Sequence, residues 1–260
     1  MKVSIITVVL NAEDTIRDTI NSILEQTYDN IEYIIVDGLS NDATIEIIQG
    51  YGNKISKFVS EADNGLYDAM NKGVSMATGD IIGILNSDDF YLNNNVIDQV
   101  VKVFKDKHVD SVFANLVYIS PNDTSRVVRY FDSGQFKPSL FAYGLMPAHP
   151  TFFVKKNIYD KYGSFHIDLK NAADFELMAR FIHTYKISYF YMERTIVKMR
   201  MGGASTSITS IGINNVEILK ACKLNGIKTN FFKISFRYVY KIMGVFKRMA
   251  LRNEQMGSRS

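Results

Sequence analysis

Two hydrophobic patterns alternate along the first third of the chain. Residues 3–9 and 31–36 form nearly continuous apolar, β-branched runs, which are typical of strands buried on both faces of a parallel sheet. Between them, residues 14–26 place isoleucine and leucine on one helical face. Because strands and helices alternate with short connections, the pattern predicts a doubly wound α/β sheet flanked by helices. The other elements predicted here are helices at 43–49 and 67–76 and strands at 57–60 and 80–85.

The alternation becomes less regular after Asp89. Residues 111–120 and 125–130 have the pattern of two strands around the turn at 121–123, and the sheet is expected to be mixed. The other elements predicted in this part are helices at 96–104 and 173–185 and strands at 151–154 and 187–191.

We expect one domain over residues 1–205, followed by a helical tail over 206–260. No internal repeat or Pro/Gly-rich linker divides the chain, and the loop at 202–203 is the candidate boundary. The charge is also divided. Residues 212–260 hold ten Lys/Arg and two Glu, a charge of +8, so residues 1–211 carry −5 of the net +3. This asymmetry predicts a second task for the tail.

The basic tail has the pattern of an amphipathic helix over residues 231–252. At about 100° per residue its cations share one arc, and most of its aromatic and aliphatic residues lie opposite. Such a helix suits anionic lipid headgroups, so we expect it on the cytoplasmic membrane face. Packing on the domain or on a second subunit is the alternative. The cations are Lys233, Arg237, Lys241, Lys247, Arg248 and Arg252, and the apolar residues include Phe232, Phe236, Val239 and Ile242.

Composition excludes several classes of protein. Of 260 residues, 47% are hydrophobic and 22% charged, which is typical of a globular protein and excludes disorder or low complexity. The single Cys222 excludes an internal disulfide framework and a CxxC metal site. No apolar run reaches the roughly 18–20 residues of a spanning helix, and the N-terminus lacks a signal-peptide pattern. We therefore expect a cytoplasmic location.

Polar residues gather just past the C-terminal ends of the predicted strands. Open parallel sheets bind their ligands at that edge. The chain has neither a GxGxxG nor a GxxxxGK[ST] motif, which disfavours a dinucleotide site and a P-loop. The clusters are residues 7–11 together with Asp37, residues 60–73, residues 86–89 and residues 171–176.

Each cluster has a structural alternative. The adjacent Asp88 and Asp89 repel each other unless a cation or donors compensate, and a hard divalent cation does so, but a capping turn is the alternative. Asp37 either binds a base or ribose or closes an Asx-turn. Asp174 is either a functional carboxylate or an ordinary first-turn acid. The segment 60–73, with Asp63, Asp68 and Lys72, is either a polar pocket or a solvated loop, and His149 is expected to be structural.

In this order, the clusters resemble the family 2 glycosyltransferases of the nucleotide-diphospho-sugar transferase (GT-A) fold. Residues 4–11 resemble the family's first strand, and residues 34–44 resemble its VVDDGSTDGT segment. Asn86–Asp89 stands at the position of its DADD motif, and Ala173-Asp174 at that of its catalytic base. The resemblance covers residues 2–205 and is strongest to bacterial enzymes that build O-antigen, capsule or exopolysaccharide.

The resemblance implies a role for each of ten residues. Asp174 would deprotonate the acceptor hydroxyl, Asp88 would ligate Mn²⁺ or Mg²⁺ at the diphosphate, and Asp89 would orient the donor sugar. Residues 1–90 would bind the nucleotide sugar and 91–205 the acceptor, and the reaction would be one in-line displacement with inversion. The residues implied in binding the nucleotide sugar are Thr7, Asn11, Asp37, Asp63, Lys72, Asn86 and Ser87.

The sequence departs from the family pattern at two positions. Asn86 replaces the first acid of the metal motif, and Ala173 replaces the usual Glu before the base. An amide still hydrogen-bonds a ribose or a metal-bound water, so we expect weakened rather than lost metal binding.

The resemblance implies transfer of a hexose, with UDP-glucose as the expected donor and a β linkage formed. The implied acceptor is a polyprenyl-diphosphate-linked sugar, in O-antigen or similar surface polysaccharide biosynthesis. Nucleic acid is not expected as a partner, and a homodimer is left open. A degenerate sugar-nucleotide-binding protein without activity is the alternative, favoured only by Asn86. A nucleotidylyltransferase is disfavoured because residues 8–14 contain no glycine.

Overall fold

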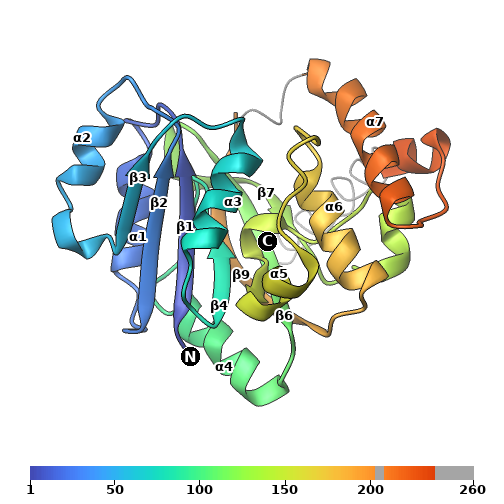
Figure 1. The fold of residues 1–260 in the computed structure, drawn as a ribbon, viewed down its shortest axis with the longest axis horizontal. Helices are drawn as coiled ribbons and strands as arrows, with labels where there is room; N and C mark the ends of the chain where they lie inside the picture. Colours follow the sequence, from blue (N-terminus) through green and yellow to red (C-terminus); the bar gives the residue numbers. More distant parts are fainter. Residues whose placement is uncertain (203–207, 238–260) are drawn as a thin grey trace, which may run out of the picture.

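The computed structural model describes residues 1–202 and 208–237. One mixed sheet runs through this part of the chain, in the strand order β3-β2-β1-β4-β8-β6-β9-β5, with β7 paired to β6 (Figure 1). The strands are β1 (Val3–Val9), β2 (Ile31–Asp37), β3 (Lys57–Ser60), β4 (Ile81–Ile84), β5 (Phe90–Tyr91), β6 (Ser111–Ser120), β7 (Asp123–Phe131), β8 (Phe153–Lys155) and β9 (Tyr189–Arg200).

The first four strands in that order are parallel, and β8 then runs antiparallel between β4 and β6. The predicted doubly wound mixed α/β sheet is therefore confirmed. The α-helices are α1 (Ile16–Leu24), α2 (Thr44–Gln49), α3 (Leu66–Met76), α4 (Val96–Lys107), α5 (Lys156–Tyr162), α6 (Ala173–Ala179) and α7 (Ile208–Leu224). Shorter turns are η1 (Gly52–Lys54), η2 (Pro138–Tyr143), η3 (His149–Thr151) and the π-helical η4 (Arg180–Thr184).

Strand β1 is buried because helices cover both faces of the sheet. All seven residues of β1 are buried. Successive side chains of a strand point to opposite faces, so Ile6 and Val8 pack with α3, α5, α6 and α7, while Ile5 and Val9 pack with α1, α2 and α4. A continuous apolar run is therefore the pattern that this position requires.

Helix α7 packs beside α6, as Figure 1 shows. Ile218, Ala221 and Cys222 of α7 are buried in the same apolar cluster as Phe175 of α6. The predicted boundary at 202–203 lies partly outside the described residues. Residues of α7, which belong to the expected tail, are therefore part of the hydrophobic core of the domain.

The described part of the amphipathic tail differs from the helical-wheel prediction. Residues 231–237 are helical. Arg237 is buried and donates to Asn215 Oδ1 at 2.7 Å, whereas Phe232 is 86% exposed and Phe236 50% exposed. The wheel prediction placed Arg237 in one arc with Lys233 and the two phenylalanines largely opposite. In this structure Ile234 and Arg237 pack inward, so the buried face combines an apolar residue with one cation of the predicted basic arc. Residues 238–260 lie outside the described part.

Within the described ranges, no helix combines the length and apolar character needed to cross a membrane.

Candidate active site

The ends of β1, β2 and β4 form one edge of the sheet. Val9 of β1 is paired with Asp37, the last residue of β2. Ile6 of β1 is paired with Ile84, the last residue of β4, so the turn at 86–89 leaves the sheet at the same edge. The register therefore brings together the clusters that the sequence places after these strands.

The turn at 86–89 contains a fully buried carboxylate. The Asp89 amide donates to the Asn86 carbonyl at 3.1 Å, which closes the turn. The side chain of Asp89 is fully buried, and both its oxygens and Asn86 Oδ1 have no hydrogen-bond partner in the described chain. Burial, and next the charge of Asp88, hold the pKa of Asp89 well above its usual range. Burial also raises the pKa of Asp88, and the charge of Arg200 offsets the shift at both carboxylates only in part.

Mn²⁺ or Mg²⁺ fits this donor set only with help from a substrate. Both ions take oxygen ligands, and Mg²⁺ is often bound by one or two carboxylates plus substrate phosphates. No group of three or more His, Cys, Asp or Glu side chains could hold a metal in the described ranges. Asp88 would thus share the ion with the diphosphate. Ser87 is half-buried in the same turn.

Arg200, at the end of β9, fixes the backbone of this turn. Its Nη1 donates to the Asp88 carbonyl at 2.9 Å, and its Nη2 forms an ion pair with Asp18 of α1. The guanidinium also lies over the Phe90 ring, 5.1 Å from its centroid. The sequence analysis did not find Arg200, because 112 residues separate it from Asp88.

Asp37 and Thr7 lie inside the edge rather than on an open surface. Both are fully buried. Asp37 accepts hydrogen bonds from the Ser40 amide at 3.0 Å, from Ser60 Oγ at 2.6 Å and from Ser40 Oγ. Thr7 Oγ1 is 3.2 Å from the Tyr33 hydroxyl. In this structure both residues order the sheet edge, and their contact with a nucleotide stays a prediction.

Asn11 is exposed at the same edge, in the left-handed region with φ of 51°. Its side-chain oxygen accepts the Asn41 amide at 2.9 Å, and its own amide donates to Ser40 Oγ at 2.8 Å. The turn that Asp37 orders through Ser40 therefore also holds Asn11.

Asp63 and Lys72 belong to the loop before α3 and to α3 itself. Asp63 lies against Gly38, where an added Cβ would stand 2.5 Å from its carboxylate oxygen, so glycine permits the close approach. Lys72 Nζ is 2.9 Å from Glu61 Oε1 and 2.6 Å from the Ala62 carbonyl. The hydrogen bond with Glu61 raises the pKa of Lys72. Lys72 thus holds the loop that carries Asp63.

Asp174 opens α6, as the sequence predicted, and is half-buried. Its Oδ1 accepts the Tyr67 hydroxyl at 3.1 Å and the Phe175 amide at 2.8 Å. Its Oδ2 accepts no hydrogen bond from the described residues, so one oxygen remains available to a ligand. Burial, opposed by the charge of Asp174, lowers the pKa of the buried His149.

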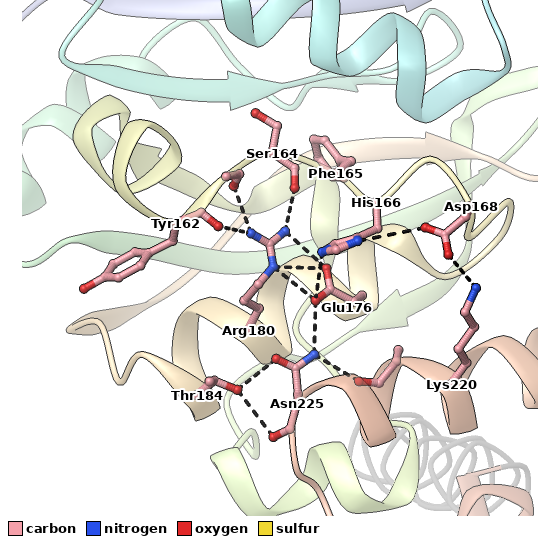
Figure 2. A network of polar contacts seen from close by, with 12 residues as sticks. Tyr162, Ser164, Phe165, His166, Asp168, Glu176, Arg180, Thr184, Lys220 and Asn225 are labelled. Atoms are coloured by element: carbon pink, nitrogen blue, oxygen red, sulfur yellow. Dashed lines mark hydrogen bonds and ion pairs between the residues drawn. The ribbon is translucent and has the colours of Figure 1, made fainter.

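A polar network fixes the far side of α6 (Figure 2). Arg180 Nε donates to Glu176 Oε1 at 3.0 Å, and its guanidinium also reaches the carbonyls of Tyr162, Gly163 and Ser164. Figure 2 shows the carbonyls of Tyr162 and Ser164 directed at Arg180, and with Gly163 they hold the loop after α5 on α6. Asn225 donates to Glu176 from beyond α7, at 3.2 Å. The i,i+4 spacing of Glu176 and Arg180 is a signal that the sequence offers.

Glu217 of α7 holds the segment that leads into α6. Its carboxylate accepts the backbone amides of Lys170, Asn171 and Ala172 at 3.0, 2.7 and 3.0 Å. These residues directly precede the helix that carries Asp174. Glu217 is therefore a structural support of the candidate base, and no local motif predicted it.

Comparison with known proteins places the chain in a family. Residues 4–168 match the model of the family described as Glycosyl transferase family 2, and the chain belongs to that family. It is 29% identical to an uncharacterized glycosyltransferase of Rickettsia typhi over 231 residues, covering 84% of this chain and 69% of that one. It is 26% identical to a PGL/p-HBAD biosynthesis glycosyltransferase of Mycobacterium bovis, covering 83% and 88%. The predicted family resemblance is confirmed.

Solved structures share the fold. Staphylococcus aureus TarS superimposes with a TM-score of 0.65 at 20% identity, over 84% of this chain and 40% of TarS. A shorter TarS structure in complex with UDP-GlcNAc gives 0.62 at 19% identity, over 84% and 67%. A Pyrobaculum calidifontis mannosyltransferase in complex with GDP-Man and Mn²⁺ gives 0.64 at 16% identity, over 90% and 69%. The architecture is of the GT-A type.

Proposed function

We propose that this chain is an inverting glycosyltransferase that moves a hexose from a UDP-sugar to a hydroxyl of a sugar acceptor. The observation that carries the proposal is the buried carboxylate of Asp89 beside Asp88, whose oxygens have no hydrogen-bond partner in the described chain, at the strand ends where open parallel sheets bind ligands. A carboxylate in that state needs hydroxyl donors or a cation.

The proposed mechanism assigns separate tasks to three carboxylates. Asp174 Oδ2 takes the proton of the acceptor hydroxyl while that oxygen attacks the anomeric carbon. The bond from this carbon to the diphosphate breaks, and the nucleoside diphosphate leaves with the electron pair. Asp89 accepts hydrogen bonds from the donor sugar, and Asp88 would hold the divalent ion. When bound, that ion stabilises the negative charge of the leaving group.

UDP-glucose is the donor that we propose, with a β linkage formed. The TarS complexes contain UDP and UDP-GlcNAc, and the mannosyltransferase complex contains GDP-Man, which supports a nucleotide sugar as donor class. Purified protein is to be incubated with a panel of UDP- and GDP-sugars, with and without glycan acceptors, while free nucleotide is measured. UDP binding without turnover of any donor would favour the degenerate binding protein instead.

We further propose a polyprenyl-diphosphate-linked acceptor, a role in O-antigen or related surface polysaccharide biosynthesis, and peripheral contact with the inner membrane face. The support is an exposed surface at the start of the predicted amphipathic helix. Phe231 and Phe232 are 53% and 86% exposed, beside exposed Lys228 and Lys233. Aromatic side chains among cations suit a membrane of anionic lipid. A second copy of the chain is the competing occupant.

A further inference from the structure

Helix α3 contacts both parts of the proposed site. Near its C-terminal end, Lys72 holds the loop of Glu61 and Ala62 that leads to Asp63. From its first turn, Tyr67 reaches Asp174 across 107 residues of sequence. One rigid element therefore links the proposed donor side to the proposed base.

The contact with Asp174 is specific to the Tyr67 hydroxyl. Oη lies 3.1 Å from Asp174 Oδ1, and the tyrosine side chain is buried. Its ring stacks on Phe165 with centroids 5.5 Å apart and planes at 23°. Burial, and next the charge of Asp174, hold the pKa of Tyr67 well above its usual range, so the hydroxyl keeps its proton and donates.

A second contact fixes Phe165, the residue on whose ring Tyr67 stacks. Asn71, one turn further along α3, donates through Nδ2 to the Phe165 carbonyl at 2.9 Å and accepts the Phe165 amide through Oδ1 at 2.8 Å. The amide thus pairs with both backbone groups of Phe165, as a neighbouring strand would. The loop before α6 is therefore locked to α3 independently of Tyr67, and the tyrosine hydroxyl is not required merely to join the two parts.

We propose that Tyr67 is a positioning residue for the transfer reaction, which holds Oδ1 of Asp174 so that Oδ2 remains directed to the acceptor hydroxyl. This inference rests on the proposed role of Asp174 as base. A packing role alone would need the ring but not the hydroxyl, and a core position would be filled equally well by phenylalanine.

The test compares Tyr67→Phe, Asp174→Asn and the double variant with the wild type. Tyr159→Phe is the matched control, because Tyr159 is also buried and packs on Phe165 at 6.5 Å without donating to Asp174. Tyr67→Phe keeps every carbon atom of the ring. Rates are expressed per molecule that binds UDP, so that a loss of folded protein does not imitate a loss of catalysis.

We expect Tyr67→Phe to lower kcat roughly tenfold or more, as for a lost hydrogen bond to a charged group, with donor KM and UDP affinity unchanged. Tyr159→Phe should keep the wild-type kcat. If Asp174→Asn retains a measurable residual rate, adding Tyr67→Phe should not lower that rate further, because the hydroxyl acts only through that carboxylate.

Three results would overturn the inference or its basis. A wild-type kcat in Tyr67→Phe, with Asp174→Asn inactive, would refute the role of Tyr67 and leave the proposed function intact. Multiplying losses in the double variant would mark Tyr67 as purely structural. Transfer by Asp174→Asn at the wild-type rate would instead refute Asp174 as the base, and the inference with it.

Discussion

At the scale of single residues, this protein keeps a carboxylate where burial opposes its charge. Asp89 is fully buried without a hydrogen-bond donor among the described residues, and its neighbour is another carboxylate. The motif was readable because Asn86–Asp89 is contiguous. Arg200, Tyr67 and Glu217 were not readable, since each acts on residues that only the fold brings near.

Asp89→Asn should separate stability from activity. The free energy of unfolding of the metal-free variant should be about 1 kcal/mol or more higher than that of the wild type at pH 7.5, because the substitution removes a buried carboxylate whose charge burial and Asp88 oppose. Since burial raises the pKa of Asp89 in the folded state, the wild type should gain stability as the pH falls, and the variant should lack this gain. Urea unfolding in EDTA at pH 7.5 and 5.5 measures both effects. A less stable variant would contradict the account.

At the scale of elements, local pattern predicted the strands well where burial is continuous. β1 and β6, which are buried over nearly all of their length, have the predicted bounds, and so does the half-buried β3. The pattern predicts that this strand ends at Tyr191, but β9 continues to Arg200. The prediction stops early because exposed Glu193 and Arg194, at a register shift against β6, interrupt the apolar pattern. The sequence analysis missed α5 because only Ile158 and Tyr159 of its seven residues are buried, too few for a helical period.

The helix predicted over 173–185 begins as expected, but its last part is the π-helical turn η4. Hydrophobic periodicity could not show this change in hydrogen bonding. The Glu217 support, the network of Figure 2 and the inward packing of Ile234 all required tertiary contacts.

Glu32 connects several elements near the N-terminal ends of the parallel strands β1 and β2. It accepts Ser4 Oγ at 2.6 Å and both the amide and the hydroxyl of Thr78 at 2.7 Å, and it pairs with Lys2 and Lys57 at 3.1 Å. Burial opposes ionisation, but these hydrogen bonds outweigh it and lower the pKa of Glu32 below its usual range. The carboxylate therefore connects β1, β2, β3 and the segment before β4.

Glu32→Gln should lower the free energy of unfolding by about 1–3 kcal/mol at pH 7. Because the folded-state pKa is depressed, the contribution of Glu32 is complete above the unfolded value of about 4.3 and is lost as the pH falls further. The difference between variant and wild type should therefore shrink below pH 4. Glu193→Gln, at an exposed position, is the control. An equal loss at both glutamates would refute this interpretation of the cluster.

At the scale of the whole molecule, the tail and the catalytic core are not separate bodies. Glu217 and Asn225 support α6, and Ile234 is buried in the same core. Removing the tail would therefore disturb the segment that leads to Asp174, the proposed base. A test of membrane contact must leave these inward residues in place and change only those that point outward.

Replacing Phe231 and Phe232 by serine should abolish flotation with anionic liposomes at low salt while leaving the fold intact. The two side chains are largely exposed, so their loss removes membrane contact rather than core packing. Serine at Val127 and Val128, exposed residues of β7, is the control. If the wild type does not float, or if the Phe variant floats equally well, the aromatic surface is not the membrane contact. A concentration-dependent dimer lost in the Phe variant would identify a second copy as its occupant.

The central claim is that Asp88 and Asp174 carry out two halves of one metal-dependent transfer. The most direct measurement is nucleotide release from UDP-glucose and related donors, with and without glycan acceptor, for the wild type, Asp88→Ala and Asp174→Asn, in Mn²⁺ or in EDTA. We predict acceptor-dependent release by the wild type in Mn²⁺ only, with a loss of roughly 10²–10³ or more in Asp88→Ala. Asp174→Asn should bind UDP normally yet not transfer. Full activity in EDTA, or in either variant, would contradict the account.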